Sequence, residues 1–464
     1  VPTFYHPLIP LLADSNIEVQ ISTIRAATRI GTPELIPYLL PKLSHPLTRW
    51  YATDALNQCI GQDLPRLEEL LQNDRHLPEA RRQLIHLLAH HHSPQAVQLL
   101  VAQLHSDDDL LRSAAYQTLM KLRDAGLSIP GQPLRGVLHE ELRSAYELHV
   151  VRHDLRRTHG LLEEGLERRI RQAEDRILTL LDLLHPDLSH TQIRESLDDR
   201  SSRLRATVIE LLDNVVEREM NELLLPLFGP SASERLEVAR GQLRIPERSG
   251  TEILRQLATT ADSWLRSCAL HAIGESLLEQ LGDPVDASLD DPDPLVRETA
   301  RTARARLDRA RQTPLPKDPS SPSQPGGDSA MALSTLEKVF FLKSASLFEQ
   351  IPGEEIIGMV PIIHEVEIKE GETFIKKGDD GDCLYILVAG RVHIKRDAEH
   401  QDTAQSREVI GEISVLTEQP RSADCTALTD VVALRIDKKD FWTLMEEQPQ
   451  ITIEVLKVIV DRYI

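Results

Sequence analysis

A repeated pair of residues, an aliphatic side chain followed by arginine, constrains how most of this chain can fold. The pair recurs at Leu111-Arg112, Leu142-Arg143, Leu204-Arg205, Leu265-Arg266 and Val296-Arg297, while Arg49 and Arg81 fall close to the same spacing and Arg176 and Arg235 fit it less well. The period is about 31 residues, within the range of repeat architectures. We therefore expect each pair to open one helix of a repeating unit.

Local signals agree with helices at these positions. Asp-rich turns precede several of the arginines, starting at Asp107, Asp198 and Asp290, and an aspartate side chain caps the first N–H groups of a helix. An apolar helix is expected before each arginine helix. The first one shows a 3.6-residue period after Pro33, with apolar residues at Leu35, Ile36, Leu39, Leu40 and Leu43.

This pattern resembles HEAT repeats, which stack helix pairs into a curved solenoid. One unit cannot bury its apolar stripe alone, so neighbouring units form a continuous core and leave a long exposed surface. The resemblance implies an all-α solenoid over residues 1–310, with a protein partner on its surface. An irregular, longer helix is expected through Leu138 to Leu184.

Residues 311–331 differ from their surroundings in composition. The segment is rich in Pro, Ser and Gly and shows no apolar periodicity. Such a composition predicts a linker without a packed core. It would let the flanking domains reorient unless they dock directly.

Residues 332–464 show a strand pattern in place of the helical repeat. Gly371, Gly378, Gly381 and Gly390 separate short apolar runs at 374–375, 384–388 and 392–394. Glycine at these spacings suits tight turns that need a positive φ. The pattern predicts a small antiparallel β jelly roll with flanking helices.

The stretch from Ile410 to Ala423, IGEISVLTEQPRSA, has the parts needed to bind a cyclic phosphate and its ribose. Glu412 can accept a hydrogen bond from a sugar hydroxyl, and Arg421 presents a planar, charged fork to phosphate oxygens. The apolar residues from Ile413 to Leu416 predict a short helix whose first N–H groups face the anion.

This segment resembles the phosphate-binding cassette of cyclic-nucleotide-binding domains, found in the catabolite activator protein and in regulatory subunits of protein kinase A. The stretch from Phe340 to Pro352 is similar to the helical lead-in of such domains. The resemblance implies a cyclic nucleotide as ligand. Cyclic AMP is favoured over cyclic GMP because Ser422 stands where members selective for cyclic GMP often carry Thr and where cyclic-AMP binders also carry Ser, although a serine hydroxyl could meet the guanine amine too. The ligand-binding residues that it implies are Gly411, Glu412, Ile413, Ser414, Arg421, Ser422 and Ala423.

Two departures from the family pattern leave an alternative open. The segment from Asp397 to Val409 is polar and contains no glycine, which predicts a trimmed strand pair before the cassette. The sequence also stops at Ile464, early in the helix that serves as a lid in the family. The alternative is a degenerate domain that binds no nucleotide and acts as a protein-interaction scaffold.

The composition of the chain excludes several classes of function. The chain has 464 residues, a formal net charge of −20, 41% hydrophobic residues and 4% aromatic residues. A field of this sign repels nucleic acid phosphates, so we expect no nucleic-acid partner. Cys59, Cys268, Cys383 and Cys425 lie far apart in apolar patterns, which predicts reduced core thiols. The sequence has no signal peptide and no run of about 20 apolar residues, which favours a cytoplasmic location.

The sequence gives only weak evidence for metal-binding or catalytic residues. His90 to His92 precede Pro94 at an expected helix end, and His149 and His153 form an i, i+4 pair. A third ligand is not placed by the sequence, so exposed helix-end histidines are the favoured interpretation. The sequence contains no Walker A, GxGxxG, GxSxG or HExxH motif. We expect no metal, no cofactor and no enzymatic activity.

The order of the predicted domains suggests a wider context. The sequence begins at Val1 without an initiator methionine. A solenoid, a linker and a nucleotide-binding domain in this order resemble the soluble C-terminal part of bacterial fusions to transporters similar to ATP/ADP translocases, as does the stretch from Arg176 to Val216. We therefore expect the cytosolic portion of a larger membrane protein.

Overall fold

The computed structural model describes residues 5–44, 46–61, 63–72, 78–106, 108–155, 160–185, 218–312, 333–345, 347–397, 399–417, 419–447 and 452–453. Contacts divide the chain into two compact units, Val1–Val150 with Arg169–Glu247 and Val151–Arg168 with Arg248–Ile464. Most of the predicted linker, the repeat pair at Leu204-Arg205 and the predicted lid helix lie outside the described residues. The predicted domain boundaries stay a prediction.

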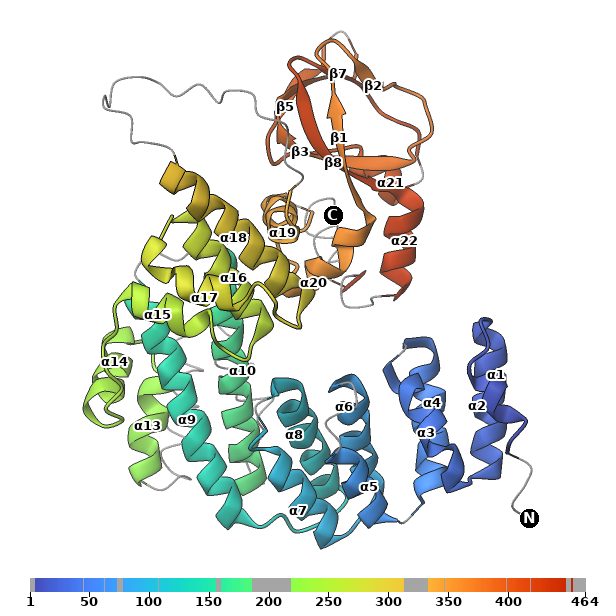
Figure 1. Ribbon diagram of the computed structural model, residues 1–464, viewed down its shortest axis with the longest axis vertical. Coiled ribbons are helices and arrows are strands. Elements are labelled where there is room, and N and C mark those ends of the chain that lie inside the picture. Colours follow the sequence, from blue (N-terminus) through green and yellow to red (C-terminus); the bar gives the residue numbers. More distant parts are fainter. Residues whose placement is uncertain are drawn as a thin grey trace. The chain divides into compact units, whose positions relative to one another are not determined.

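The first unit is built from helices, as expected. They are α1 (Leu8–Leu12), α2 (Ile17–Ile30), α3 (Ile36–Leu39), α4 (Pro46–Ile60), α5 (Leu64–Leu71), α6 (Pro78–Leu87), α7 (Pro94–Gln103), α8 (Asp109–Asp124), most of α9 (Gly131–Asp154) and α10 (Gly160–Leu184), α13 (Arg218–Phe228) and α14 (Ala232–Gly241). Helices near in sequence pack together, for example α2 with α4 and α6 with α8 (Figure 1). The helical class is confirmed, whereas HEAT-type stacking stays a prediction.

The second unit combines further helices with a β-domain. Its helices are α15 (Gly250–Leu257), α16 (Ser263–Glu275), α17 (Gly282–Ala287), α18 (Pro294–Gln312), α19 (Thr335–Ser344), α20 (Gly353–Ile356), α21 (Glu412–Thr417) and α22 (Lys438–Glu447). The ends of α9 and α10 belong to it as well. No helix among the described residues is long and apolar enough to cross a membrane.

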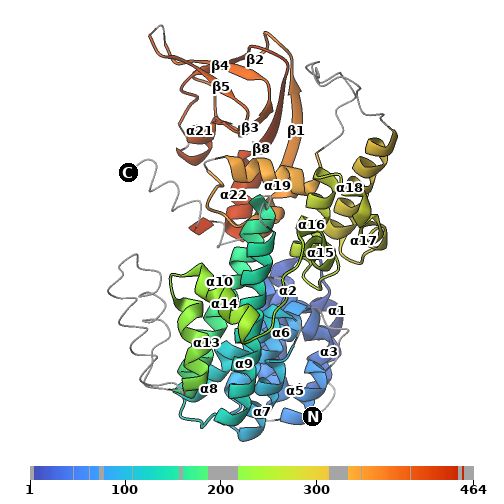
Figure 2. The same cartoon turned by 90° about the vertical axis from the view of Figure 1, so that its left-hand side faces the viewer.

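The β-domain consists of two antiparallel sheets (Figure 2). Its strands are β1 (Ile363–Ile368), β2 (Thr373–Ile375), β3 (Cys383–Ala389), β4 (Arg391–Lys395), β5 (Gln401–Gln405), β6 (Val409–Ile410), β7 (Asp424–Ala427) and β8 (Val431–Asp437). The sheet orders are β1-β8-β3-β6 and β2-β7-β4-β5. A core of side chains from strands of both sheets lies between them, including Leu387, Val392 and Ala433. This arrangement is consistent with the predicted jelly roll.

The repeated arginine has a defined structural role. In α4, α8, α14, α16 and α18 the arginine is the fourth residue of the helix, and its side chain donates to the backbone carbonyl six residues earlier: Arg49 to Leu43 (3.0 Å), Arg112 to Ser106 (2.6 Å), Arg235 to Gly229 (2.5 Å), Arg266 to Thr260 (2.6 Å) and Arg297 to Asp291. That carbonyl lies in the turn before the helix. In these five helices the repeated arginine therefore forms a clamp, a hydrogen bond that holds the helix start to the turn before it.

Two expectations about the helices are wrong. Arg143 lies in the middle of α9 and does not open a helix; its Nη1 donates instead to the Leu243 carbonyl, 100 residues away, at 3.1 Å. The longer helix expected from Leu138 to Leu184 is two helices, α9 and α10. The α9 end is fixed by Asp154, whose buried carboxylate accepts a hydrogen bond from Arg248 N at 3.2 Å.

The strand pair before the cassette is not trimmed. β5 pairs with β4 over five residues, from Arg391↔Gln405 to Lys395↔Gln401. Asp397 replaces glycine in the connecting turn because its Oδ1 accepts hydrogen bonds from the backbone N–H of Glu399 (2.9 Å) and of His400 (2.8 Å). An aspartate side chain can stabilise a turn in this way without a positive φ at glycine.

Helices α19 and α20, which precede the barrel, dock on helices of the repeat region within the second unit. Glu298 of α18 accepts hydrogen bonds from Thr335 N (2.7 Å) and Thr335 Oγ1 (2.6 Å) at the start of α19. Glu164 of α10 accepts from Gly353 N at 3.1 Å, and Arg168 pairs with Glu355 at 3.0 Å. The β-domain is therefore attached to helices by specific contacts as well as by the predicted linker.

Candidate functional site

The predicted cassette forms one turn between β6 and β7. Gly411 follows β6 with a φ of +87°, a left-handed conformation that favours glycine. Helix α21 begins directly after it at Glu412. A side chain at position 411 would also be blocked, because a Cβ there would lie 2.3 Å from Arg421 Nη1. Gly411 thus allows the chain to turn while the arginine side chain lies against it.

Arg421 is buried at the centre of this turn, with 6% of its surface exposed. Its Nη1 donates to the Gly411 carbonyl at 3.0 Å, and its Nη2 donates to the Cys383 carbonyl at 2.6 Å. Asp382 Oδ1 lies 3.5 Å from Nη2. A guanidinium has five N–H donors, more than these contacts require. The protein therefore holds the cation in a fixed orientation with donor capacity remaining for an anion.

The turn between β2 and β3 completes the wall of the site. Arg421 N donates to the Asp379 carbonyl at 2.9 Å, and Gly378 N donates to the Arg421 carbonyl at 2.9 Å. Gly381 packs directly on α21, since a Cβ at this position would lie 2.1 Å from Ser414 Cβ. The cassette is thus fixed from one side by a glycine-rich turn and from the other by β3.

The structure brings together Gly411, Glu412 and Arg421, three of the predicted ligand residues. Ser414 and Ala423 are buried, Ile413 is half-buried and Ser422 is exposed. Glu412 is half-buried at the first position of α21. It lies near the start of the β6–β7 connection, and Arg421 lies near its end. Their roles toward a ligand stay predictions.

Sequence reasoning missed three contributors to this site. Asp382 and the Cys383 carbonyl hold the arginine, and Trp442 of α22 donates from Nε1 to the Val415 carbonyl of α21 at 3.1 Å. The sequence GDDGDC, which contains Asp382, carried a signal: glycines and aspartates clustered just before an apolar strand. Trp442 had no comparable signal, because its contact depends on how α22 folds back against the barrel.

The thiols near the site are unreactive in character. Cys383 and Cys425 are buried, and burial raises the pKa of the Cys383 thiol and raises that of Cys425 to about 11. A thiol with a raised pKa carries little nucleophilic thiolate at neutral pH. Cys59 and Cys268 are also buried and free, so the prediction of reduced core thiols is confirmed.

The histidines considered as metal ligands occupy different environments. His90 ends a short 3-10 helix as predicted, but His91 is buried and not exposed. Burial, followed by the neighbouring His90 and His92, lowers the pKa of His91. His149 lies 3.6 Å from Glu174, and His153 lies 2.9 Å from Asp154. These two histidines therefore face separate carboxylates.

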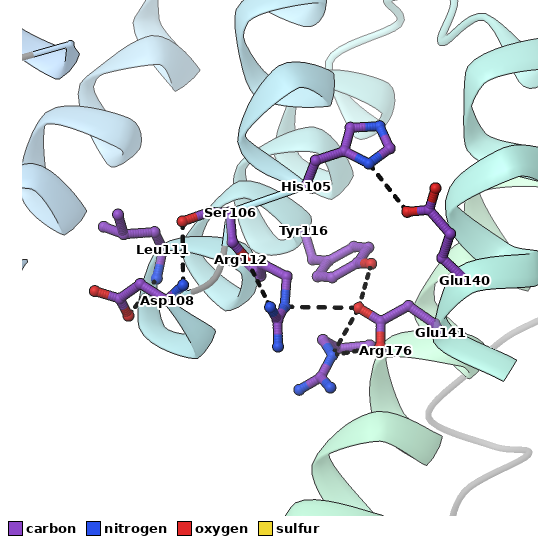
Figure 3. A network of polar contacts seen from close by, with 9 residues as sticks. All are labelled: His105, Ser106, Asp108, Leu111, Arg112, Tyr116, Glu140, Glu141 and Arg176. Carbon is purple, nitrogen blue, oxygen red and sulfur yellow. Dashed lines mark hydrogen bonds and ion pairs between the residues drawn. The ribbon is translucent and has the colours of Figure 1, made fainter. Parts of the chain in front are cut away.

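A second polar cluster lies inside the first unit (Figure 3). Glu141 of α9 accepts from Arg176 Nε at 3.0 Å and from the Tyr116 hydroxyl at 3.2 Å, while Arg112 Nε lies 3.7 Å away. All but Arg112 are buried, and burial together with Glu141 raises the pKa of Tyr116. The cluster links α8, α9 and α10, and its charges face one another. It is consistent with a structural role.

Comparisons with known proteins concern the C-terminal region. Residues 365–448 match the family model of the cyclic nucleotide-binding domain. The chain is 28% identical over 126 residues to the CRP-like cAMP-activated global transcriptional regulator of Mycobacterium tuberculosis, covering 26% of this chain and 56% of that protein. It is 28% identical over 109 residues to the cAMP-dependent protein kinase regulatory subunit of Dictyostelium discoideum, covering 22% and 33%.

Among solved structures, the N-terminal domain of a transcriptional regulator from Streptomyces coelicolor A3(2) is 27% identical, with a TM-score of 0.25, and covers 26% of this chain and 91% of that one. The family match and the curated relatives together show a regulatory-type cyclic nucleotide-binding domain, similar to that of the catabolite activator protein, in the C-terminal part of the chain. The chain spans about half, or less, of the length of these curated relatives.

Proposed function

We propose that the C-terminal domain binds a 3′,5′-cyclic nucleotide, with the phosphate at Arg421 and the ribose at Glu412. The observation that carries the proposal is the burial of Arg421 in a fixed orientation against Gly411. A charged, preorientated guanidinium favours a bidentate contact with phosphate oxygens. Its neighbour in the turn, Glu412, supplies a carboxylate that can accept from a sugar hydroxyl.

Calorimetry on the full chain tests this proposal. Cyclic AMP should bind one site per chain, and Arg421→Ala should weaken binding by about 2 to 4 kcal/mol because it removes a charge-assisted contact. That is roughly 30- to 1,000-fold in Kd. Arg421→Lys keeps the charge but not the fork, so it should give an intermediate value.

The matched control is Arg391→Ala, which removes an exposed arginine from β4 and should leave the affinity unchanged. Equal losses in Arg421→Ala and Arg391→Ala would show that only the overall charge matters. Absence of binding to the wild-type chain at millimolar cyclic AMP and cyclic GMP would rule the proposal out.

We propose cyclic AMP as the preferred ligand. Ser422 follows the arginine and is exposed, so its hydroxyl is accessible, but it lacks the β-methyl group that restricts the rotamers of a threonine. Competition titration decides between the two bases. A tenfold tighter binding of cyclic GMP, about 1.4 kcal/mol, would reverse the assignment.

A non-binding scaffold is the second candidate, and one observation favours it. Both terminal nitrogens of Arg421 already donate to backbone carbonyls, so the fold holds the guanidinium in place without a ligand. In that case the domain would serve as a packing partner for the helices. The calorimetric result above separates the two candidates.

We propose that the helical region is a HEAT-type solenoid, with a protein partner on its surface, and that occupancy of the barrel is transmitted to it through α19 and α20. The contacts of Thr335 with Glu298 and of Gly353 with Glu164 support this route. Ligand binding changes such docking only if it favours one arrangement over another. Hydrogen exchange of α19 and α20 with and without cyclic AMP tests the coupling; identical exchange would exclude it.

The wider context is also a proposal. We propose that the chain has no enzymatic or nucleic-acid-binding activity and acts on the cytoplasmic side of a larger, transporter-like membrane protein. The order of the predicted domains and the net charge of −20 support this view. The parent reading frame tests it, since a reading frame without any hydrophobic spans would contradict a membrane-protein parent.

A further inference from the structure

Three side chains at the end of the β1–β8 sheet form a group of metal-ligating atoms. His364 is the second residue of β1, Asp437 is the last residue of β8, and Asp440 lies in the first turn of α22. One ligand atom from each lies within 4.8 Å of the others. Within the part of the chain that the structure describes, this is the one such group of three.

The register of the sheet explains why these residues meet. His364 pairs with Arg435 across β1 and β8, so both side chains lie on the same face. Asp437, two residues after Arg435, lies on that face as well. Helix α22 starts at the next residue, so Asp440 is brought back beside the strand end. His364 is exposed and the two aspartates are half-buried, which leaves the group open to solvent.

We propose that His364, Asp437 and Asp440 bind a divalent transition metal ion, with Zn²⁺ as the representative. An imidazole nitrogen and carboxylate oxygens are zinc ligands with bonds of about 2.0–2.2 Å, and three protein ligands with water in the fourth position make a usual open site. Tetrahedral geometry sets the ligand atoms about 3.5 Å apart. Rotation about the side-chain bonds of the exposed His364 would bring its ring nitrogen closer to the two carboxylates. Mg²⁺ and Ca²⁺ prefer oxygen ligands alone, so they should bind less well.

The group of His364, Asp437 and Asp440 is connected to the proposed nucleotide site by a row of side chains with alternating charges. Arg435 Nη2 lies 2.8 Å from Asp437 Oδ1 and 3.8 Å from Asp382 Oδ2. Asp382 Oδ1 in turn lies 3.5 Å from Nη2 of Arg421. A carboxylate has two oxygens, so Arg435 leaves Asp437 able to bind a metal ion.

Through this row of charges, a bound metal ion should change the affinity of the nucleotide site. This part of the inference rests on the proposed function. A metal ion on Asp437 shifts Arg435 toward Asp382, which then neutralises Arg421 less. Arg421 becomes more attractive to phosphate, so Zn²⁺ should tighten nucleotide binding. The Asp382 side chain is 74% exposed, and exposed ion pairs are weak, so the gain should stay below about tenfold. By linkage, nucleotide should tighten Zn²⁺ binding by the same factor.

Calorimetric titration of the full chain with ZnCl2, without nucleotide, tests the metal site. We expect one saturable site that His364→Gln and Asp440→Asn each weaken by at least about tenfold, since even outer-shell partners contribute about 10- to 100-fold. His400→Gln is the matched control: His400 forms an exposed pair with Asp397 at 2.9 Å but is not one of the three. MgCl2 should give no comparable heat. Unchanged affinity in both site variants, or no saturable binding, would overturn the proposal.

A second measurement separates this inference from the proposed function. Cyclic AMP affinity is measured with and without Zn²⁺ in the wild-type chain and in Asp382→Asn, which should retain Zn²⁺ binding but lose the effect on nucleotide. Zn²⁺ binding without any nucleotide binding would support the metal site and contradict the nucleotide proposal. Nucleotide binding without Zn²⁺ binding would have the opposite meaning. An equal effect of Zn²⁺ in both proteins would overturn the route through Asp382.

Discussion

Glu141 carries a negative charge inside the first unit, where it lies between Arg112, Arg176 and Tyr116. We predict that Glu141→Gln lowers the free energy of unfolding by about 3 kcal/mol, because removing one partner of a buried ion pair leaves uncompensated charge. Urea denaturation measures the loss. Glu140→Gln is the control, since Glu140 is 65% exposed and pairs only with His105 in this cluster. A similar loss in both variants would contradict the role assigned to Glu141.

His91 makes stability depend on pH. Its pKa is lowered in the folded state, so the unfolded chain binds more protons than the folded chain as pH falls through the ordinary histidine range. Stability should therefore be complete above about pH 7 and decrease as the pH falls below about 6.5. His91→Asn should flatten this slope, whereas His92→Asn, at an exposed position, should not. Thermal denaturation between these pH values tests the difference.

Single residues differ in how well the sequence revealed them. The sequence singled out Arg421 and Glu412 because a phosphate cassette needs their chemistry within a few residues of each other, and their roles toward a ligand stay predictions. His91 was expected to be exposed, because a run of polar residues at a helix end gives no sign that one member packs inward. Asp382 was missed because its partner Arg421 lies 39 positions later in the sequence, and ion pairs of this kind depend on the fold.

Among the elements, the helix starts share a contact that the repeat preserves. Arg266 donates from Nη1 to the Thr260 carbonyl at 2.6 Å and pairs with Asp291. We predict that Arg266→Ala lowers the free energy of unfolding by about 1.5–3 kcal/mol, the usual contribution of hydrogen bonds to a charged group. The control is Arg301→Ala at an exposed position of α18. Denaturation of the two variants with equal midpoints would contradict the clamp.

The sequence predicted elements best where the signal is local. The arginine spacing marked the helix starts except at Arg143, and the Asp-rich turn from Asp290 does cap α18, since Asp293 Oδ1 accepts from Leu295 N at 2.8 Å. β5 was mistaken for a trimmed segment because its residues are polar and its turn uses Asp397 instead of glycine. The break between α9 and α10 was missed because the Asp154 contact that fixes it comes from Arg248, far along the chain.

At the scale of the whole molecule, a tryptophan lies between helices within the second unit, one of which, α20, leads into the β-domain. Trp264 of α16 lies against two glycines, Gly165 of α10 and Gly353 of α20, and a Cβ at Gly353 would lie 2.9 Å from its ring. We predict that Gly353→Ala destabilises the second unit by about 1–3 kcal/mol through overpacking. Gly250→Ala is the control, since Gly250 also begins a short helix but has open space around it. Thermal denaturation should show a decrease only for Gly353→Ala.

The sequence predicted the kinds of parts in this chain but not how the parts in the second unit are joined. A Pro- and Ser-rich segment suggested independent domains. The structure instead connects Glu164 with Gly353 and Arg168 with Glu355, pairs separated by 189 and 187 positions. Contacts at such separations leave no periodic pattern, so composition alone could indicate only that a linker exists.

The position of Trp264 matters when this protein is divided into fragments for expression. A fragment that begins after the linker would keep the barrel but lose Trp264, Glu164 and Arg168, and with them the surfaces that cover α19 and α20. The complementary fragment would expose an indole ring that is 7% accessible in the intact chain. Both pieces would then present fresh apolar surface and tend to aggregate. A fragment that keeps Trp264, Glu164 and Arg168 together must begin before α10.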